Sequence, residues 1–447
     1  MAKLSIPQGT RDFGPDVVRK RNYIISTIRK TFELYGFQPL ETPAMENTST
    51  LLGKYGEEGD RLIFKILNNG DILGQAQLAK DSRELGLLLC EKSLKYDLTI
   101  PFARYVAMNH GKLNLPFRRY QIQPVWRGDR PQAGRYREFY QCDADVIGSN
   151  SLINEVELLK IYDTVLTDLQ LTGYELRVNN RKILAGLAEL VGRPDLMTDI
   201  TIAIDKLDKI GENGVRQELV ERGLTDTETD KAMAFISLTG TNEQKLQRLS
   251  ELLASSDTGL KGVEELRFVL RNQLASFRVE PQLDLTLARG LNYYTGMIVE
   301  VKAPAGVNIG SIGGGGRYDD LTGLFGVPGI SGVGISFGLD RIYDVLEKLG
   351  LFPASAEEST RVIFFHPGAE RLAEVFRYAT QVRERGIAVE MYPEDIKQDK
   401  QYKYAEKRGI PFIAYVEDNA PDTIFIKDIP GKQRYTVKAG ELGDFGF

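Results

Sequence analysis

The chain contains few of the residues on which several common kinds of active site depend. It has only two histidines, His110 and His366, among 447 residues, so a histidine proton shuttle or a histidine-rich metal site has almost nothing to build on. Its two cysteines, Cys90 and Cys142, lie far apart, which excludes a disulfide framework and a cysteine-rich zinc site. We therefore expect chemistry that uses carboxylates, arginines and backbone groups, without a dedicated protein metal site.

The sequence also lacks long apolar runs and a strong excess of either charge. No stretch has the roughly 20 apolar residues that a membrane-spanning helix needs, and the opening MAKLSIPQGTRDF has no apolar core of a signal peptide. With 57 Lys and Arg against 62 Asp and Glu, the net charge is −5, which argues against a strongly basic protein but not against a local nucleic-acid surface. We expect a cytoplasmic protein with no membrane partner.

The length is sufficient for roughly two to four domains. Strand and helix patterns over 1–181 and 278–350 predict one mixed domain, which a segment of helix formers over 182–277 interrupts. A polar stretch over 351–360 predicts a linker. The alternation that follows predicts a βαβαβ unit with a parallel sheet in a further domain over 361–447.

Several local elements can be predicted from periodicity and from the breakers. A helix is expected from Pro15 to a left-handed end at Gly36. The segment FQPLETPAMENTSTL that follows contains Pro39 and Pro43, which exclude a central strand and favour an edge or an interface. Strand character returns over 283–302.

The densest signal is the segment FRRYQIQPVWRGDRPQAGRYREFYQ, residues 117–141. It holds six arginines, six aromatic residues and no lysine, on two expected strands joined by a polar turn. An exposed basic hairpin is one interpretation, but the use of Arg every time favours bidentate contact with phosphate or stacking on a base. Because side chains alternate along a strand, Gln141, Asp143 and Asp145 share one face, which we expect to line a site.

Asp97 and Thr99 form a second, weaker signal in KYDLTI, which predicts a short strand over 95–100. Two residues apart on a strand, their side chains project to the same side. A carboxylate beside a hydroxyl suits an amino-acid ammonium group. A local backbone cap is the commoner use of such a pair, and both interpretations stay open.

Three later segments have the same ambiguity. In LARGLNYYT, a loop with Arg289 precedes Tyr293 and Tyr294, which suit either core packing or one wall of a ligand site. The glycines of GGGGRYDD suit either a flexible turn or a close approach of the backbone to a ligand. In GVGISFGLDRIYDVL a strand leads into a helix over 337–349, and Arg341 in its first turn is either a surface residue or part of an anion site.

Taken in this order, these segments resemble the histidyl-tRNA synthetase family of class II aminoacyl-tRNA synthetases, over nearly the whole chain. PQGTRDFGP and ETPAMEN resemble the family's opening and motif 1, and FRRYQIQPVWRGDRPQAGRYREFYQCDADVIG resembles motif 2. GVGISFGLDRI resembles motif 3, and LARGLNYYTG and GGGGRYDDL resemble the two histidyl signature peptides. The resemblance implies an α/β (α+β) fold: an antiparallel-sheet catalytic domain with a helical insertion, and a C-terminal mixed α/β anticodon-binding domain.

The resemblance implies a histidine pocket at matching positions. Asp97 and Thr99 would hold the α-ammonium group, while Tyr293 and Tyr294 would close around the imidazole. Asp145 can accept a hydrogen bond from an imidazole N–H, and such pairing rejects isosteres that lack the donor. The residues expected to bind histidine are Asp97, Thr99, Gln141, Asp145, Tyr293 and Tyr294.

The resemblance also implies an ATP site of arginines. Arg127 would contact the α-phosphate and the carboxylate, Arg341 the terminal phosphates, and Arg289 would stabilise charge that develops at the α-phosphate. Arg127 and Arg289 are thus the expected catalytic residues. Mg²⁺ is expected with ATP as its counter-ion. Candidates for contact with ATP or the tRNA acceptor stem are the turn residues Arg130, Gln132 and Arg135.

The implied activity is that of a histidine–tRNA ligase, which uses ATP, L-histidine and tRNA(His) and forms a homodimer through motif 1. The alternative is a synthetase-like regulatory subunit of histidine biosynthesis, which ordinarily lacks the C-terminal domain that YAEKRGIPF indicates here. Asn292 stands where many relatives carry Asp, and Asp145 stands where Glu is familiar.

The C-terminal domain also contains a run of basic residues that suits either a solvated helix face or an RNA-binding surface. The run consists of Lys397, Lys400, Lys403, Lys407 and Arg408.

Overall fold

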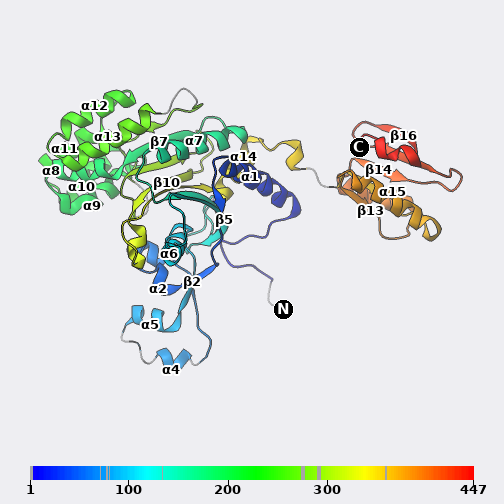
Figure 1. Ribbon diagram of the computed structural model, residues 1–447, viewed down its shortest axis with the longest axis horizontal. Helices are drawn as coiled ribbons and strands as arrows, with labels where there is room; N and C mark the ends of the chain where they lie inside the picture. Colours follow the sequence, from blue (N-terminus) through cyan, green and yellow to red (C-terminus); the bar gives the residue numbers. More distant parts are fainter. Residues whose placement is uncertain are drawn as a thin grey trace. The chain divides into compact units, whose positions relative to one another are not determined.

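The chain divides into two compact units, Met1–Phe352 and Pro353–Phe447, which are described separately (Figure 1). The computed structural model describes residues 4–70, 72–76, 79, 81–132, 134–272, 277–288, 293–357 and 360–447. Among the described helices, none has the length and apolar character that crossing a membrane requires.

An eight-stranded sheet forms the frame of the first unit, in the order β1-β5-β6-β11-β10-β9-β7-β8. The six inner strands pair antiparallel, and the two edge strands pair parallel. The mixed α/β fold and the predicted hairpin are thus confirmed, and β1 is the expected edge strand. The strands are β1 (Gln38–Pro39), β5 (Phe117–Trp126), β6 (Glu138–Ile147), β7 (Glu175–Asn180), β8 (Gln282–Leu283), β9 (Met297–Lys302), β10 (Ser311–Asp319) and β11 (Ser331–Gly338).

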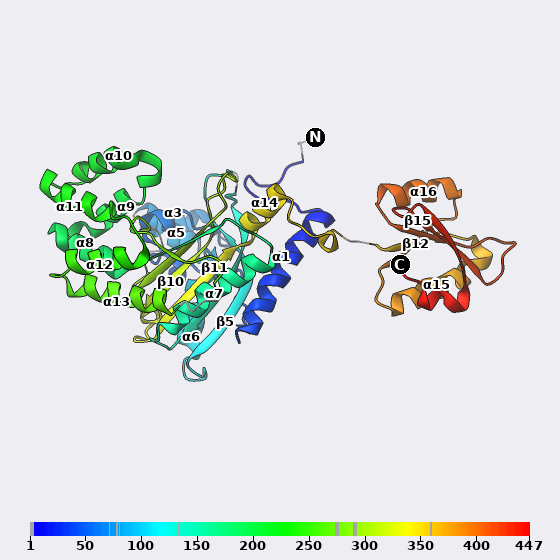
Figure 2. The ribbon, with the colours of Figure 1, turned by 90° about the horizontal axis from the view of Figure 1, so that it is seen from above.

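Three helices lie along the large sheet: α1 (Pro15–Leu34), α7 (Ile153–Asp168) and α14 (Leu339–Leu349) (Figure 2). As predicted, α1 has Pro15 in its first turn and is followed by Gly36 at a φ of 77°. The apolar face of α1 reaches the sheet, where the Phe32 ring centroid lies 5.9 Å from that of Phe337 on β11. Together with the central strands, these helices bury the main hydrophobic core of the first unit.

Six helices follow β7 and cluster at one end of the sheet (Figure 2). Side chains cap several of them: Asn180 accepts a hydrogen bond from the Lys182 N–H, and Thr225 forms a capping box with Glu228. The predicted helical character is confirmed, whereas the domain boundaries remain a prediction. The helices are α8 (Arg181–Val191), α9 (Met197–Ile204), α10 (Leu207–Glu221), α11 (Asp226–Ile236), α12 (Asn242–Leu252) and α13 (Asp257–Arg271).

A small three-stranded sheet, in the order β2-β4-β3, lies between α1 and the hairpin in the sequence. In Figure 1 its attached helices α4 and α5 are the part of this unit furthest from the large sheet. Its elements are β2 (Met45–Asn47), α2 (Thr48–Leu51), α3 (Gly56–Arg61), β3 (Lys65–Ile66), α4 (Ile72–Ala76), α5 (Ser82–Leu89), β4 (Lys92–Leu94) and α6 (Thr99–Asn109).

Two strand predictions were wrong. The stretch 95–100 is not a strand, because β4 ends at Leu94 and Thr99 begins α6. Pro101 falls in the first turn of α6, where its missing N–H has no helical partner to lose. Among the described residues of 283–302, only the two ends lie in strands, at Leu283 in β8 and from Met297 in β9.

The second unit is a five-stranded sheet in the order β13-β12-β14-β15-β16, with a helix on each face. Val362 and Phe364 pack with α15, whereas the alternating Ile363 and Phe365 pack with α16. The three βαβαβ strands are parallel, as predicted, and the last two are antiparallel. The elements are β12 (Val362–Phe364), α15 (Leu372–Glu384), β13 (Val389–Met391), α16 (Gln398–Lys407), β14 (Phe412–Tyr415), β15 (Thr423–Asp428) and β16 (Gln433–Lys438).

Candidate active site

A cavity opens on the face of the central strands β6, β10 and β11. It holds about 330 Å³ of unfilled space, part of which is open to solvent. All six residues expected to bind histidine line it, although they come from three separate segments of the chain. The lining residues are Asp97, Thr99, Gln141, Asp143, Asp145, Tyr293, Tyr294, Gly314, Tyr318, Gly334, Ile335 and Ser336.

Asp97 is fixed at one side of the cavity, between β4 and α6. Its Oδ1 accepts hydrogen bonds from the Tyr55 hydroxyl at 2.9 Å and from the Ile100 N–H at 3.1 Å. Its Oδ2 accepts from the Tyr293 hydroxyl at 3.2 Å. Burial raises the pKa of Asp97, against the effect of these hydrogen bonds. The carboxylate therefore caps the local backbone and also presents an oriented acceptor to the cavity. A backbone cap and a partner for an ammonium group, the two uses that the sequence allowed, are thus compatible.

Asp145 on β6 faces Arg119 on β5 in the antiparallel register. Its Oδ2 lies 2.8 Å from Arg119 Nη2, and its Oδ1 accepts a hydrogen bond from the Tyr318 hydroxyl at 2.5 Å. Arg119 is fully buried, with its guanidinium over the Phe102 ring. Burial raises the pKa of Asp145, and the Arg119 charge opposes that rise. The carboxylate is thus partly committed to protein partners before any ligand binds.

Asp143 is the neighbouring buried acid, opposite Gln121 in the hairpin register. Its Oδ1 has no hydrogen-bond partner among the described residues. Burial raises the pKa of Asp143, the Arg119 charge lowers it, and the Asp145 charge raises it again. A buried acceptor without a partner costs free energy unless a ligand satisfies it. The sequence placed Asp143 on the correct face but assigned it no role.

A group of arginines lies at the other end of the hairpin. Arg127, just after β5, donates from Nε to the Tyr96 carbonyl at 3.0 Å and lies over the Tyr96 ring. Arg341, in the first turn of α14 as predicted, donates to the Gly134 carbonyl at 2.7 Å and the Ser311 carbonyl at 2.5 Å. Burial and the neighbouring Arg135 and Arg127 charges lower the pKa of Arg341. Like charges held this close favour binding of an anion.

The sequence predictions for the remaining residues have different outcomes. Arg289, the expected catalytic arginine, and Asn292 lie outside the described residues, so the role of Arg289 stays a prediction. The three turn candidates are all exposed, and Gln132 and Arg135 exchange main-chain hydrogen bonds of 2.8 and 3.2 Å. Across the described residues, no three His, Cys, Asp or Glu side chains are grouped to hold a metal ion.

The glycines of GGGGRYDD lie in the central strand β10, so the flexible-turn interpretation was wrong. A Cβ on Gly315 would lie 2.2 Å from the Gly334 carbonyl oxygen, and one on Gly316 would lie 2.9 Å from the Tyr294 ring. A Cβ on Gly334 would lie 2.0 Å from Asp145 Oδ1. These positions therefore require glycine because neighbouring strands and site residues pack directly on the backbone.

Sequence comparison assigns this site to a known family. A family model described as histidyl-tRNA synthetase matches residues 9–342, which include every described residue of the cavity. The chain belongs to the histidyl-tRNA synthetase family. A second family model, described as an anticodon binding domain, matches residues 360–445, within the second compact unit.

Curated relatives and solved structures agree with this assignment. The chain is 54% identical to the histidine–tRNA ligase of Christiangramia forsetii over 92% of this chain and 91% of that protein. It is 53% identical to that of Bacteroides fragilis, over 99% and 98%. The crystal structure of histidyl-tRNA synthetase from Nostoc sp. PCC 7120 matches with a TM-score of 0.82 and 30% identity, over 99% of both chains.

A more distant structural neighbour shows the fold alone. That neighbour is described as an ATP phosphoribosyltransferase regulatory subunit/histidyl-tRNA synthetase from Bacillus halodurans C. The match has a TM-score of 0.70 at 20% identity, over 89% of this chain and 96% of that chain. A shared fold does not by itself assign an activity.

Proposed function

We propose that this chain attaches L-histidine to tRNA(His), first activating histidine with ATP and then transferring it to the 3′-terminal adenosine. The observation that carries this proposal is the cavity, where three buried carboxylates lie at one end of a hairpin whose other end holds a cluster of arginines. The first group suits a cationic amino acid, and the second suits a polyphosphate.

In the first step, a carboxylate oxygen of histidine attacks the α-phosphorus of ATP. A new P–O bond forms, the bond to the β-phosphate oxygen breaks, and pyrophosphate leaves with that electron pair. Asp97 would hold the α-ammonium group, Arg127 the α-phosphate and Arg341 the terminal phosphates. This step needs oriented charge and no side-chain base, so the enzyme acts by positioning and electrostatic stabilisation. Mg²⁺ would accompany the phosphates of ATP as a counter-ion.

In the second step, the terminal ribose hydroxyl of the tRNA attacks the acyl carbon of histidyl-adenylate, and AMP leaves. The exposed turn that carries Arg130, Gln132 and Arg135 is our candidate for contact with ATP or the acceptor stem. We further propose that the second unit binds the anticodon region of the tRNA, which the family-model match supports.

Selection of histidine would depend on the buried acceptors and the tyrosine pair. Among the described residues, Asp143 Oδ1 and Asp145 Oδ2 have no hydrogen-bond partner, whereas Asp145 Oδ1 accepts a hydrogen bond from Tyr318. Both acids can therefore accept hydrogen bonds from the N–H groups of an imidazole. The Tyr293 and Tyr294 rings lie edge to face, with centroids 5.0 Å apart, and form one wall. Amino acids without a ring N–H would leave the buried acceptors unpaired and would be rejected.

We also propose a homodimer that forms through motif 1, and a cytoplasmic location. Both residues of β1 are exposed at the edge of the large sheet, where a second copy could pair. For the domains, we propose a catalytic domain over 1–181 and 278–350, an insertion over 182–277 and a linker over 351–360, followed by the anticodon-binding domain over 361–447.

The test is ATP–pyrophosphate exchange by the purified full chain with Mg²⁺, across all twenty amino acids and without tRNA. Exchange with histidine alone is the expected result. Exchange with a different amino acid would retain adenylate chemistry but overturn the assignment of the pocket. No exchange by the folded protein would overturn the ligase proposal and favour the regulatory alternative.

A further inference from the structure

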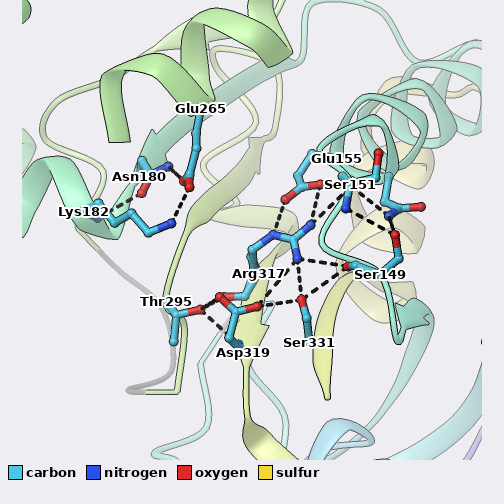
Figure 3. A network of polar contacts seen from close by, with 11 residues as sticks. Ser149, Ser151, Glu155, Asn180, Lys182, Glu265, Thr295, Arg317, Asp319 and Ser331 are labelled. Atoms are coloured by element: carbon cyan, nitrogen blue, oxygen red, sulfur yellow. Dashed lines mark hydrogen bonds and ion pairs between the residues drawn. The ribbon is translucent and has the colours of Figure 1, made fainter. Parts of the chain in front are cut away.

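Arg317 on β10 is the centre of a buried polar network (Figure 3). Its side chain is only 4% exposed, and its Nε and Nη2 donate to the two carboxylate oxygens of Glu155 at 2.5 and 2.9 Å. Glu155 is fully buried in the first turn of α7. Arg317 Nη1 donates to Ser331 Oγ at 2.6 Å. This bidentate pair fixes the orientation of the guanidinium against two elements.

The network continues through Asp319 to Thr295 (Figure 3). Asp319 Oδ1 accepts from Ser331 Oγ at 2.7 Å and lies 3.6 Å from Arg317 Nη1. Asp319 Oδ2 accepts from the Thr295 hydroxyl at 2.9 Å, and the Asp319 N–H donates back to the same hydroxyl at 3.0 Å. The Thr295 N–H also donates to the Arg317 carbonyl at 2.8 Å. Thr295 is therefore held to β10 by both its main chain and its side chain.

Thr295 directly follows the two tyrosines that line the cavity. The Tyr293 hydroxyl reaches Asp97, and the Tyr294 ring lies against Gly316. In contrast, Arg317, Asp319 and Thr295 do not line the cavity. Because the chain runs without a break from the tyrosines into Thr295, the position of that residue sets where the tyrosine wall stands.

The free-energy cost of burying the Arg317 network indicates that its role is to position residues. A buried ion pair gives little net stability, because desolvation of both charges offsets their attraction. Arg317 is moreover shared between two acids, Glu155 and Asp319, whereas one acid would neutralise it. The second acid is the one that holds Thr295. The network therefore serves mainly to hold Thr295 in a defined position, and it adds little to the stability of the fold.

The chain before the tyrosines is held by a different element. Asn179 Nδ2 donates to the Leu287 carbonyl at 2.9 Å, and Arg181 Nη1 to the Ala288 carbonyl at 3.2 Å. These anchors lie at the junction of β7 and α8 and do not include the Arg317 network. A substitution at Thr295 should therefore leave the hydrogen bonds that hold Leu287 and Ala288 in place.

We propose that Arg317, Asp319 and Thr295 form a positioning relay that holds Tyr293 and Tyr294 over the histidine pocket. This inference rests on the proposed function, because it treats the cavity as the site of histidine. None of the three relay residues lines the cavity, and Thr295 is the one that joins the relay directly to the tyrosine wall. The relay should therefore govern histidine binding while leaving the ATP end of the hairpin unchanged.

The test compares Thr295→Val, which removes the hydroxyl, with Thr295→Ser, which retains it. In histidine-dependent ATP–pyrophosphate exchange we expect Thr295→Val to raise the KM for histidine about tenfold, because one hydrogen bond to a carboxylate is lost. The KM for ATP and the melting temperature should stay at wild-type values, and Thr295→Ser should restore the KM for histidine. Thr164→Val is the matched control, because its hydroxyl bonds the Lys160 carbonyl within α7 and does not contact the network.

Several outcomes would overturn the relay. An unchanged KM for histidine in Thr295→Val would do so, as would equal impairment in Thr295→Ser or in Thr164→Val. If Thr295→Val does not fold, Ser331→Ala, which removes the hydroxyl between Arg317 and Asp319, carries the same expectation. Failure of the wild-type chain to exchange with histidine would overturn the proposed function and the relay with it. Normal wild-type exchange with unaffected variants would overturn the relay alone.

Discussion

The pairing of Arg119 with Asp145 determines how charge is arranged beneath the cavity. Asp97, Asp143 and Asp145 are all buried there, and burial raises the pKa of each. A carboxyl group whose pKa is raised by folding lowers the stability of the native state as the pH rises above its ordinary pKa, and the loss is complete once the pH exceeds the raised native pKa. Arg119 is the buried cation that limits this cost for Asp143 and Asp145, and Arg127 limits it for Asp97. A bound ammonium or imidazole group would limit the cost further. The buried acids therefore lower the stability of the native state, and the proposed binding of a cationic amino acid would offset part of that loss.

Replacing Arg119 with Met tests this account. The variant Arg119→Met keeps the volume but leaves Asp145 without its cation, and we expect a loss of about 3 kcal/mol in the free energy of unfolding at pH 8. The loss should be smaller at pH 5, because the unpaired carboxyl takes up a proton as the pH falls through its raised native pKa. Urea denaturation followed by tryptophan fluorescence measures it, because the single tryptophan, Trp126, ends β5 in the first unit.

The neighbouring residue supplies the control. Arg118 precedes Arg119 on the same strand, and its partner Glu157 is more than one-third exposed, so Arg118→Met should cost less than about 1 kcal/mol. If the two variants lose equal stability, or if the loss from Arg119→Met does not shrink at pH 5, the buried pair is not the source of the effect.

At the level of elements, periodicity and breakers predicted the hairpin, α1 and α14 because each depends on local rules. The six residues expected to bind histidine were identified by resemblance, and the structure brings them together in one cavity; their role in binding histidine stays a prediction. Arg119 was missed because its partner becomes visible only once the register of β5 and β6 is known. Thr99 was misplaced on a strand because Pro101 was taken to end an element, whereas it belongs to the first turn of α6.

The glycine strand β10 could not be predicted from the sequence, because its glycines reflect close packing of three strands. Gly315→Ala tests this packing. The added methyl group would meet the Gly334 and Ile335 backbone at 2.2 and 2.8 Å, and we expect a loss of about 2 kcal/mol in the free energy of unfolding. The same fluorescence measurement applies.

Gly310→Ala is the matched control for that strand, because a Cβ there meets no atom within 4 Å. It should leave both stability and histidine-dependent exchange unchanged. Stability of Gly315→Ala equal to that of the wild type would show that the backbone separates readily there, and it would contradict the packing explanation.

For the whole molecule, the second unit carries a basic helix face that the proposed catalytic chemistry does not use. The lysines of α16 are exposed, as the sequence pattern allows for both a solvated face and an RNA surface. We expect the triple variant Lys400→Gln, Lys403→Gln and Lys407→Gln to weaken tRNA binding. The slope of log affinity against log salt should fall by about one for each phosphate that a lysine no longer neutralises. Filter binding across a salt series measures this slope.

Amino-acid activation separates that effect from damage to the first unit, because ATP–pyrophosphate exchange without tRNA should be unchanged in the triple variant. Equal removal of charge from Lys427, Lys432 and Lys438, in the same unit, is the matched control. If the slope of log tRNA affinity against log salt is unchanged in the α16 variant, the helix face is only solvated and does not bind RNA.

The Arg119–Asp145 pair also constrains how the pocket can change over evolutionary time. Replacing the arginine alone leaves a carboxylate buried without its cation, and replacing the aspartate alone leaves a buried guanidinium. Each single substitution therefore gives a less stable protein, whereas the simultaneous replacement of both residues does not. The two positions should be inherited as a unit, and a lineage that left this state would need a stabilising change elsewhere first.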